Sequence, residues 1–429
     1  MKFRLEDIYK KEYGIDKNIV KFVNDSVKNL TKEFEDLDSI QEFNMTKVLN
    51  SFKKNRLSNT AFNWTTGYGF GDDGVVTTEK IFSDIFHTED SLVRSNIVSG
   101  THAISIVLFA LTNYADEIIS ITGDPYDTLQ DVIGISGNSK GNLKSRGINY
   151  TKIDLKDGKI QYDKINKDLL KNKKIVLLQR STGYSNRSAF TIDELEKAIK
   201  LCKKSNPNSI IFVDNCYGEF TELKEPTDIG ADIIAGSLIK NIGGGIALTG
   251  GYITGKKDLI EYCANYLTSP AIGKEEGLSF GTTRNVLQGL YFAPKTTMES
   301  IKVGLLFSMA FSKLDYDIIP KVNQKRSDIV QSIILKDKEK MIDFCKSIQE
   351  VCSIDSHITP IPYLMPGYQD EVIMSAGGFI DGATSELSAD GPIREPFIIY
   401  LQGGLNFYQG KLALMNVLQK FKDKNYIEI

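Results

Sequence analysis

The sequence predicts an α/β protein with a mostly parallel sheet, and three observations support this fold class. Short apolar, β-rich runs recur along the middle of the chain, at Glu117–Ile121, Ile175–Leu178, Ile210–Val213, Ile233–Ala235 and Gly251–Ile253. Helical segments separate several of these runs, as in chains that build parallel sheets. Runs this short and apolar are also typical of strands that are covered on both faces. The content of 41% hydrophobic and 25% charged residues over 429 positions favours a globular chain over a disordered one.

Three parts are predicted along the chain. Residues 1–58 are rich in Lys, Glu and Asp, and Ile19, Phe22 and Val23 begin an apolar stripe at helical spacing, which predicts an N-terminal helical arm. Residues 59–295 contain the strand–helix pattern and are expected to form the large domain. Residues 296–429 are expected to form a smaller C-terminal α/β domain, with helices at Thr296–Lys313 and Lys411–Lys420.

Within the large domain, helices are predicted around Glu79–Phe86 and over Thr191–Lys204. Thr191 and Glu194 have the spacing of a capping box, in which each side chain binds the other residue's backbone N–H. The earlier helix follows the glycine-rich stretch Gly67–Gly74, which contains a G-x-G-x-x-G pattern. A dinucleotide site would need a strand directly before these glycines, and none is predicted, so we interpret the stretch as a flexible connection.

Charge and composition exclude several classes of function. Lys and Arg number 52 against 55 Asp and Glu, for a net charge of −3, which favours neither a nucleic-acid nor a membrane partner. The five cysteines and three histidines lack metal-site spacing, so no metal is expected. Met1–Tyr13 is too charged for a signal peptide, and Ala103–Leu111 is too short to span a bilayer. We therefore expect a reduced, cytoplasmic protein.

Candidate chemistry begins at Ser99-Gly100-Thr101, which precedes the apolar helical run Ile104–Leu111. Small residues at a helix start leave backbone N–H groups free at the positive end of the helix dipole, which suits a phosphate group. The alternative is that Ser99 or Thr101 simply caps the helix.

An acid and a base follow later strands. Asp214 comes directly after the run Ile210–Val213, at the sheet edge where ligands bind in α/β proteins, although a solvated loop aspartate is the alternative. Lys240 follows the run Ile233–Ala235 and has apolar and glycine-rich flanks. Such flanks predict a desolvated lysine with a lowered pKa that can form a Schiff base with a carbonyl, the alternative being an ordinary surface charge.

The order of these features matches the needs of pyridoxal phosphate. Its phosphate needs N–H donors, its pyridine nitrogen needs an anion, and its aldehyde needs an amine. Ser237 precedes Lys240 by three residues, and Tyr126, after the first strand, provides an aromatic ring at the same sheet edge. We therefore predict pyridoxal 5′-phosphate as the cofactor.

The sequence also resembles the fold-type I pyridoxal-phosphate enzymes, specifically the aluminium resistance protein, or cystathionine β-lyase and methionine γ-lyase-like, family. The stretches that carry this resemblance are Arg94–Ala103, Ile121–Leu129, Phe212–Phe220, Gly236–Asn241 and Glu386–Arg394, and they are spread over nearly the whole chain. The resemblance implies the fold-type I architecture.

The resemblance further implies the roles of individual residues. Lys240 would carry the cofactor, Asp214 would pair with the pyridine nitrogen, and Tyr126 would stack on the ring. The phosphate would be held by Gly100, Thr101 and Ser237. Related trans-sulfuration enzymes bring a Tyr-x-Arg element from a neighbouring subunit to the phosphate; this chain has no such tripeptide, and Tyr68 is the candidate substitute. The substrate carboxylate would be bound by Arg394, with Arg180 and Arg284 as competing candidates.

The implied activity is that of a carbon–sulfur lyase acting on a sulfur-containing amino acid by β- or γ-elimination, with release of thiol, ammonia and a 2-oxo acid. Lys240 would remove the α-proton, and Tyr126 would protonate the leaving sulfur. The alternatives are another pyridoxal-phosphate reaction, such as aldol cleavage or transamination, or a non-catalytic ligand-binding protein in metal tolerance. Relatives assemble as dimers or tetramers, so a homo-oligomer is expected.

Overall fold

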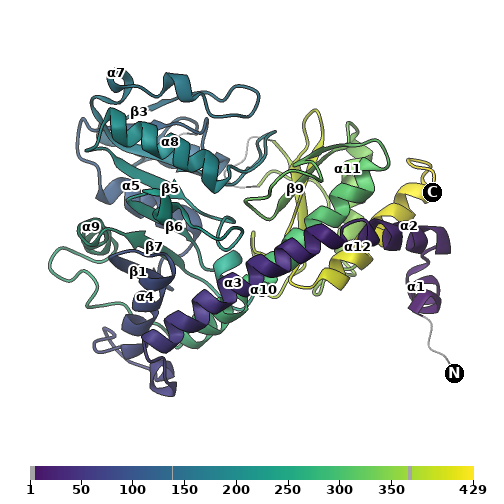
Figure 1. Cartoon of the computed structure of the whole chain (residues 1–429), viewed down its shortest axis with the longest axis horizontal. Coiled ribbons are helices and arrows are strands. Elements are labelled where there is room, and N and C mark those ends of the chain that lie inside the picture. Colours follow the sequence, from purple (N-terminus) through teal and green to yellow (C-terminus); the bar gives the residue numbers. More distant parts are fainter. Residues whose placement is uncertain (1–4, 138, 366–369) are drawn as a thin grey trace. The chain divides into compact units, whose positions relative to one another are not determined.

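The computed structural model describes residues 5–137, 139–365 and 370–429 (Figure 1). The chain divides into two compact units, each described by itself below. The larger unit is Gln41–Lys295, and the smaller one combines the chain up to Ile40 with Thr296–Ile429. The first part of the predicted helical arm is therefore grouped with the C-terminal residues. The predicted domains 1–58, 59–295 and 296–429 stay a prediction.

The larger unit is built on a seven-stranded sheet with the order β1-β7-β6-β5-β4-β2-β3. Its strands are β1 (Asp90–Arg94), β2 (Glu117–Ser120), β3 (Asn149–Lys152), β4 (Lys173–Gln179), β5 (Ile210–Asp214), β6 (Ile233–Ser237) and β7 (Gly251–Gly255). Neighbours from β3 to β6 pair in parallel, whereas β7 runs antiparallel to both β6 and β1. The carboxyl ends of β2, β4, β5 and β6 therefore lie at one edge of the sheet.

All five predicted strand runs are strands of this sheet, so the mostly parallel α/β class is confirmed. Two strands, β1 and β3, were not predicted. Both are edge strands, and each has few apolar residues: Leu92 and Val93 in β1, and Tyr150 in the largely exposed β3. Edge strands often carry polar or charged residues, which discourage pairing with another chain.

Helices cover both faces of this sheet. The helices of this part are α4 (Asp73–Ile85), α5 (Gly100–Ala110), α6 (Asp127–Ile133), α7 (Lys167–Leu170), α8 (Ile192–Ser205) and α9 (Lys257–Leu267). One core contains side chains of α4 and α8 together with Ile211 and Val213 of β5. The opposite core contains side chains of α5, α6 and α9 with Phe212 of the same strand. The alternation along β5 is the two-residue period of a strand buried on both faces.

Two predicted features of this unit differ in their outcome. The capping box is confirmed: the Thr191 hydroxyl accepts the N–H of Glu194 at 3.2 Å, and the Glu194 carboxylate accepts the N–H of Thr191 at 2.9 Å. The glycine-rich stretch was only partly a connection, because α4 already begins at Asp73. Gly74 lies inside this helix, where a Cβ atom would come within 2.0 Å of the carbonyl oxygen of Ala61. Tight packing thus explains the last glycine of the motif.

The smaller unit contains a five-stranded antiparallel sheet with the order β10-β11-β12-β9-β8. Its strands are β8 (Asp317–Ile319), β9 (Val330–Ile334), β10 (Val372–Ser375), β11 (Ser388–Pro392) and β12 (Ile398–Gln402). Its helices are α1 (Leu5–Tyr13), α2 (Lys17–Lys28), α11 (Lys338–Gln349) and α12 (Phe407–Asp423). The rings of Phe311, Phe344 and Phe421 pack together in its core.

Two long helices have residues in both units: α3 (Thr31–Lys54) and α10 (Thr283–Ser312). The predicted helices at Thr296–Lys313 and Lys411–Lys420 correspond to the second half of α10 and to the middle of α12. Short 3-10 helices lie at Asn59–Phe62, Lys144–Arg146, Tyr162–Lys164, Pro226–Ile229 and Asn241–Gly243. None of the helices in the described ranges has the length and apolar character needed to cross a membrane.

Candidate active site

The candidate site lies at the edge of the seven-stranded sheet where parallel strands end. Strand β5 ends at Asp214 and strand β6 at Ser237, with Lys240 three residues further on. The register places Asp214 beside Gln179 of β4 on one side and beside Ala235 of β6 on the other. Adjacent parallel strands therefore bring together residues that are far apart in sequence. This edge is where α/β proteins bind ligands.

Asp214 is a buried carboxylate, with 4% of its surface exposed. The backbone N–H of Cys216 donates to its Oδ1 at 3.1 Å. Burial raises the pKa of Asp214, and the positive charge of Lys240 opposes this shift. The structure therefore excludes the alternative of a solvated loop aspartate. A buried carboxylate needs a cation or strong donors to stay ionised.

Lys240 extends its amine over the ring of Tyr217, with Nζ 4.0 Å from the ring centroid. None of the ion pairs among the described residues involves this amine. The prediction of a lowered pKa was wrong for the chain by itself. Burial alone would lower the pKa of Lys240, but the charges that Cys216, Tyr217, Tyr126 and Asp214 can carry outweigh it and raise the pKa. The residues next to Lys240 in the sequence are apolar, but the groups next to its amine in space are acidic. The prediction failed because it considered only the sequence neighbours.

Tyr126 is fixed at both its backbone and its hydroxyl. Its N–H donates to Oε1 of Gln179 at 2.8 Å, at the end of the neighbouring strand β4. Its hydroxyl and that of Thr101 form a hydrogen bond, and Thr101 also contacts the Thr128 hydroxyl at 3.2 Å. Burial, followed by the charge of Asp214, raises the pKa of Tyr126, so its phenol keeps its proton at neutral pH.

Gly100 and Ser237 form a cradle at the start of α5. The Ser99 hydroxyl accepts the N–H of His102 at 3.0 Å, so the alternative that Ser99 caps this helix is correct. A Cβ atom on Gly100 would lie 3.1 Å from Sγ of Cys216 and 3.2 Å from Cβ of Ser237. A side chain at this position would thus fill the space between α5 and the end of β6. The cap and an anion seat are compatible, because the first N–H groups of a helix have no partner within the helix.

The loop after Asp214 supplies residues whose roles were not predicted. Nδ2 of Asn241 donates to the carbonyl oxygens of Tyr217 at 2.8 Å and Glu219 at 3.1 Å. Asn241 therefore ties this loop to the turn that carries Lys240. Tyr217 has φ +66°, a conformation that non-glycine residues rarely adopt. The run Phe212–Phe220 carries part of the family resemblance, but no signal in the sequence predicts the structural roles of Tyr217 and Asn241.

Arg180 is completely buried, and its terminal N–H groups donate hydrogen bonds to other groups of the protein. The acceptors, at 2.9–3.2 Å, are the Asn215 side chain, the Gly218 carbonyl, the Thr221 hydroxyl and the Glu222 carboxylate. The Glu225 carboxylate lies 3.5 Å away. A substrate carboxylate at Arg180 would have to displace these internal partners, which weakens this candidate.

The other predicted binding residues are more exposed. The guanidinium of Arg284 lies 4.2 Å from the ring centroid of Phe62. Arg394, in the smaller unit, forms an ion pair with Asp370 at 2.9 Å and keeps 49% of its side chain exposed. Tyr68 is 67% exposed. The roles of all three stay predictions.

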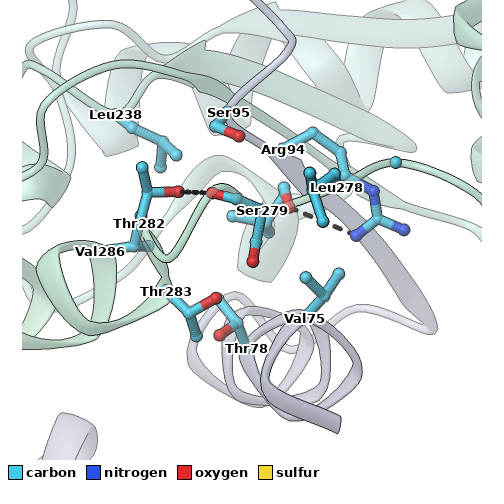
Figure 2. Close-up of a pocket in the computed structure, with 12 residues that line it drawn as sticks. Val75, Thr78, Arg94, Ser95, Leu238, Leu278, Ser279, Thr282, Thr283 and Val286 are labelled. Carbon is cyan, nitrogen blue, oxygen red and sulfur yellow. Dashed lines mark hydrogen bonds between the residues drawn. The ribbon is translucent and has the colours of Figure 1, made fainter. Parts of the chain in front are cut away.

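A small cavity near the site is distinct from it. Figure 2 shows side chains of α4, such as Thr78, and of α10, such as Val286, pointing into this cavity beside Leu238 and Arg94. Its volume is about 20 Å³, which is room for about one water molecule. The cavity is therefore too small for a cofactor.

Residues at the sheet edge fit the chemistry of pyridoxal phosphate. The start of α5 at Gly100 offers the N-terminal N–H groups of a helix to a phosphate, and the buried Asp214 can accept a hydrogen bond from a pyridinium N–H. Lys240 provides an amine free of ion pairs within the described residues, and Tyr126 a fixed ring. Six of the predicted residues are thus on this edge, namely Lys240, Asp214, Tyr126, Gly100, Thr101 and Ser237.

Comparison with known proteins assigns the family. The family model described as methionine gamma-lyase matches residues 19–422. The chain belongs to this family. The uncharacterized protein YnbB of Bacillus subtilis (strain 168) is 47% identical over 393 residues, which are 91% of this chain and 93% of that protein. The solved structure of a carbon-sulfur lyase involved in aluminum resistance, from Clostridium novyi NT, has a TM-score of 0.93 at 44% identity and covers 98% of this chain and 100% of its own.

A more distant structure identifies the fold. The pyridoxal-5′-phosphate dependent protein YhfS of Escherichia coli has a TM-score of 0.61 at 14% identity, over 90% of this chain and 97% of its own. A likeness at this identity is a likeness of fold alone. The predicted fold-type I architecture is thereby confirmed.

Proposed function

We propose that this protein is a pyridoxal-phosphate-dependent carbon–sulfur lyase that acts on a sulfur-containing amino acid. The observation that carries the proposal is the convergence of the Lys240 amine, the buried Asp214 carboxylate and the Tyr126 hydroxyl at one sheet edge. Membership of the methionine gamma-lyase family and the likeness to a carbon-sulfur lyase structure support it.

The chain offers a separate group for each part of the cofactor. The first N–H groups of α5, at Gly100 and Thr101, and the Ser237 hydroxyl would hold the phosphate. Asp214 would hold a proton on the pyridine nitrogen, and Tyr126 would cover the ring. When bound, pyridoxal phosphate withdraws electrons from the α-carbon of an amino acid.

Lys240 and Tyr126 would move the protons. Nζ of Lys240 would bind the cofactor and, once released by the substrate amine, would take the α-proton. The Tyr126 hydroxyl keeps its proton at neutral pH, because burial raises its pKa. It would donate that proton to the departing sulfur, while its hydrogen bond to Thr101 holds the oxygen in place. After hydrolysis by one water molecule, the products would be a thiol, ammonia and a 2-oxo acid.

The first test is the cofactor. The purified chain, supplied with pyridoxal phosphate, should show a visible absorption band, and borohydride should fix the cofactor to Lys240, as read by peptide mass spectrometry. A protein that stays colourless with added cofactor would overturn the proposal.

The second test is the reaction. Cystathionine, methionine and homocysteine would be screened for release of thiol and 2-oxo acid, and the identity of the oxo acid separates loss from Cβ and from Cγ. A cofactor-loaded protein that exchanges no α-proton of any amino acid for deuterium would instead support the ligand-binding alternative. Products of aldol cleavage or transamination without thiol would reassign the reaction.

A further inference from the structure

A second buried carboxyl group lies behind the lysine turn. Glu219 has no exposed surface, and the Tyr252 hydroxyl donates to its Oε1 at 2.8 Å. Its other oxygen, Oε2, is buried without a hydrogen-bond partner among the described residues. The mechanism above assigns no role to this acid. Keeping a fully buried carboxyl group ionised costs free energy when one of its oxygens has no hydrogen bond, unless the group stays protonated or a nearby cation balances its charge.

The sheet makes room for this pair at Gly236, the residue before Ser237. A Cβ atom on Gly236 would lie 2.7 Å from Oε1 of Glu219 and 2.6 Å from Cε1 of Tyr252. Aromatic rings form the far side, where Phe86 stacks on Tyr252 with centroids 5.3 Å apart. The Glu219–Tyr252 pair is therefore packed tightly under β6 and away from water.

The same contacts connect Glu219 to Lys240. Asn241, the residue after Lys240, holds the carbonyl oxygens of both Glu219 and Tyr217, and the Tyr217 ring lies below the Lys240 amine. The backbone of Glu219 and the turn of Lys240 are thus fixed to the same loop, and the charges of the two side chains also interact.

The ionisable groups that act on Glu219 come from several elements. Burial raises the pKa of Glu219 to about 8. Hydrogen bonds from its own backbone N–H and from Tyr252 on β7 oppose the shift, the nearby Glu225 adds to it, and the charge of Lys240 opposes it less strongly. The thiol of Cys216 also interacts with Glu219. Among these groups Lys240 is the cation.

We propose that Glu219, held by Tyr252, is a positioning residue that in its ionised form stabilises the protonated Lys240 amine. The proposal rests on the proposed role of Lys240. With Asp214 occupied by the cofactor ring, an ionised Glu219 would balance a proton on Nζ. The other buried carboxylates of this loop, Glu222 and Glu225, pair with Arg180.

The test measures the Lys240 amine directly, in the full chain prepared free of pyridoxal phosphate. Trace acetylation with acetic anhydride between pH 9 and 10.5, read by peptide mass spectrometry, gives the reactivity of Lys240 relative to that of the exposed Lys53. Glu219 is ionised in this range, because its pKa is about 8. Glu219→Gln keeps the size and the acceptor for Tyr252 but removes the charge.

In Glu219→Gln the relative reactivity of Lys240 should rise about tenfold, because losing an opposite charge lowers the pKa of the amine by about one unit. Tyr252→Phe, which weakens the ionised form of Glu219, should give a smaller rise. An unchanged relative reactivity in either folded variant, even with lowered stability, would overturn the proposal and leave Glu219 a structural role. Because neither cofactor nor substrate is used, this outcome is independent of whether the protein proves to be a lyase.

Discussion

Two cations at the same sheet edge, Arg180 and Lys240, have opposite surroundings. Arg180 follows β4 and Lys240 follows β6, with β5 between these strands. Both terminal nitrogens of Arg180 donate to internal acceptors, and two carboxylates balance its charge. Lys240 has an aromatic ring beneath its amine and no ion pair among the described residues. The difference separates a cation that internal carboxylates neutralise from one whose amine forms no ion pair with the described residues.

One loop, residues 215–225, contacts both cations. Glu222 and Glu225 neutralise Arg180, whereas Tyr217 and Glu219 face the turn of Lys240. A change in this loop should therefore affect stability when it touches the arginine side, and reactivity when it touches the lysine side.

The largest expected effect is on the lysine side. Lys240→Ala should lower turnover by at least about 10³-fold, because the proposed proton acceptor is lost, and should abolish borohydride capture of the cofactor. Steady-state assays for 2-oxo acid measure it, with circular dichroism to verify folding. Substantial remaining turnover would contradict the proposed mechanism.

On the arginine side, Arg180→Ala should lower the free energy of unfolding by about 3–5 kcal/mol, because buried carboxylates lose their partner. Urea denaturation measures the change. The control is Arg284→Ala, which loses only a stacked, exposed guanidinium and should cost less than about 1 kcal/mol. If the two variants had equal free energies of unfolding, Arg180 would not be a cation that stabilises the fold.

Asp214→Asn should lower turnover by about 10²-fold, the size typical of losing one preorganised electrostatic partner. The matched control is Asp124→Asn, an exposed carboxylate whose ion pair with Lys152 is at the surface, and its turnover should match the wild type. Unchanged turnover in Asp214→Asn would argue against its role at the pyridine nitrogen.

Glu219 should also make stability depend on pH. Its pKa is about 8 in the folded chain against 4.5 ordinarily, so unfolding between these values releases a proton. The free energy of unfolding should therefore fall as pH rises, by about 2–3 kcal/mol from pH 5.5 to 7.5. Glu219→Gln should lack this component when both proteins are denatured in urea at the two pH values. If the free energy of unfolding changed equally with pH in the wild type and in Glu219→Gln, Glu219 would be ionised over the whole range from pH 5.5 to 7.5.

The smallest effect concerns substrate binding. Arg394→Ala should raise KM about tenfold with kcat nearly unchanged, since a charge-assisted hydrogen bond contributes about 1.5 kcal/mol or more. Its stability should hardly change, because the exposed pair with Asp370 contributes at most about 1 kcal/mol. If KM rises in Arg284→Ala and not in Arg394→Ala, the role moves to Arg284.

Much of the fold followed from local pattern. The five apolar runs are strands because each is apolar over its whole length, and the Thr191 cap could be predicted because its partners are three residues apart. Strands β1 and β3 were missed because edge strands carry few apolar residues. The start of α4 was missed because Gly74 is a poor helix former that is required there by packing against Ala61.

The sequence by itself determined the order of the chemistry: a helix start with small residues, an aromatic ring, an acid and an amine, each after a strand. Parallel pairing then makes their convergence a consequence of topology. Only the tertiary structure decided the state of each group. It buried Asp214, surrounded Lys240 with acids that raise its pKa, paired Arg180 with buried carboxylates and enclosed Glu219 beneath β6. The physical reason is that burial and charge act through space, so a pKa depends on neighbours that are distant in sequence.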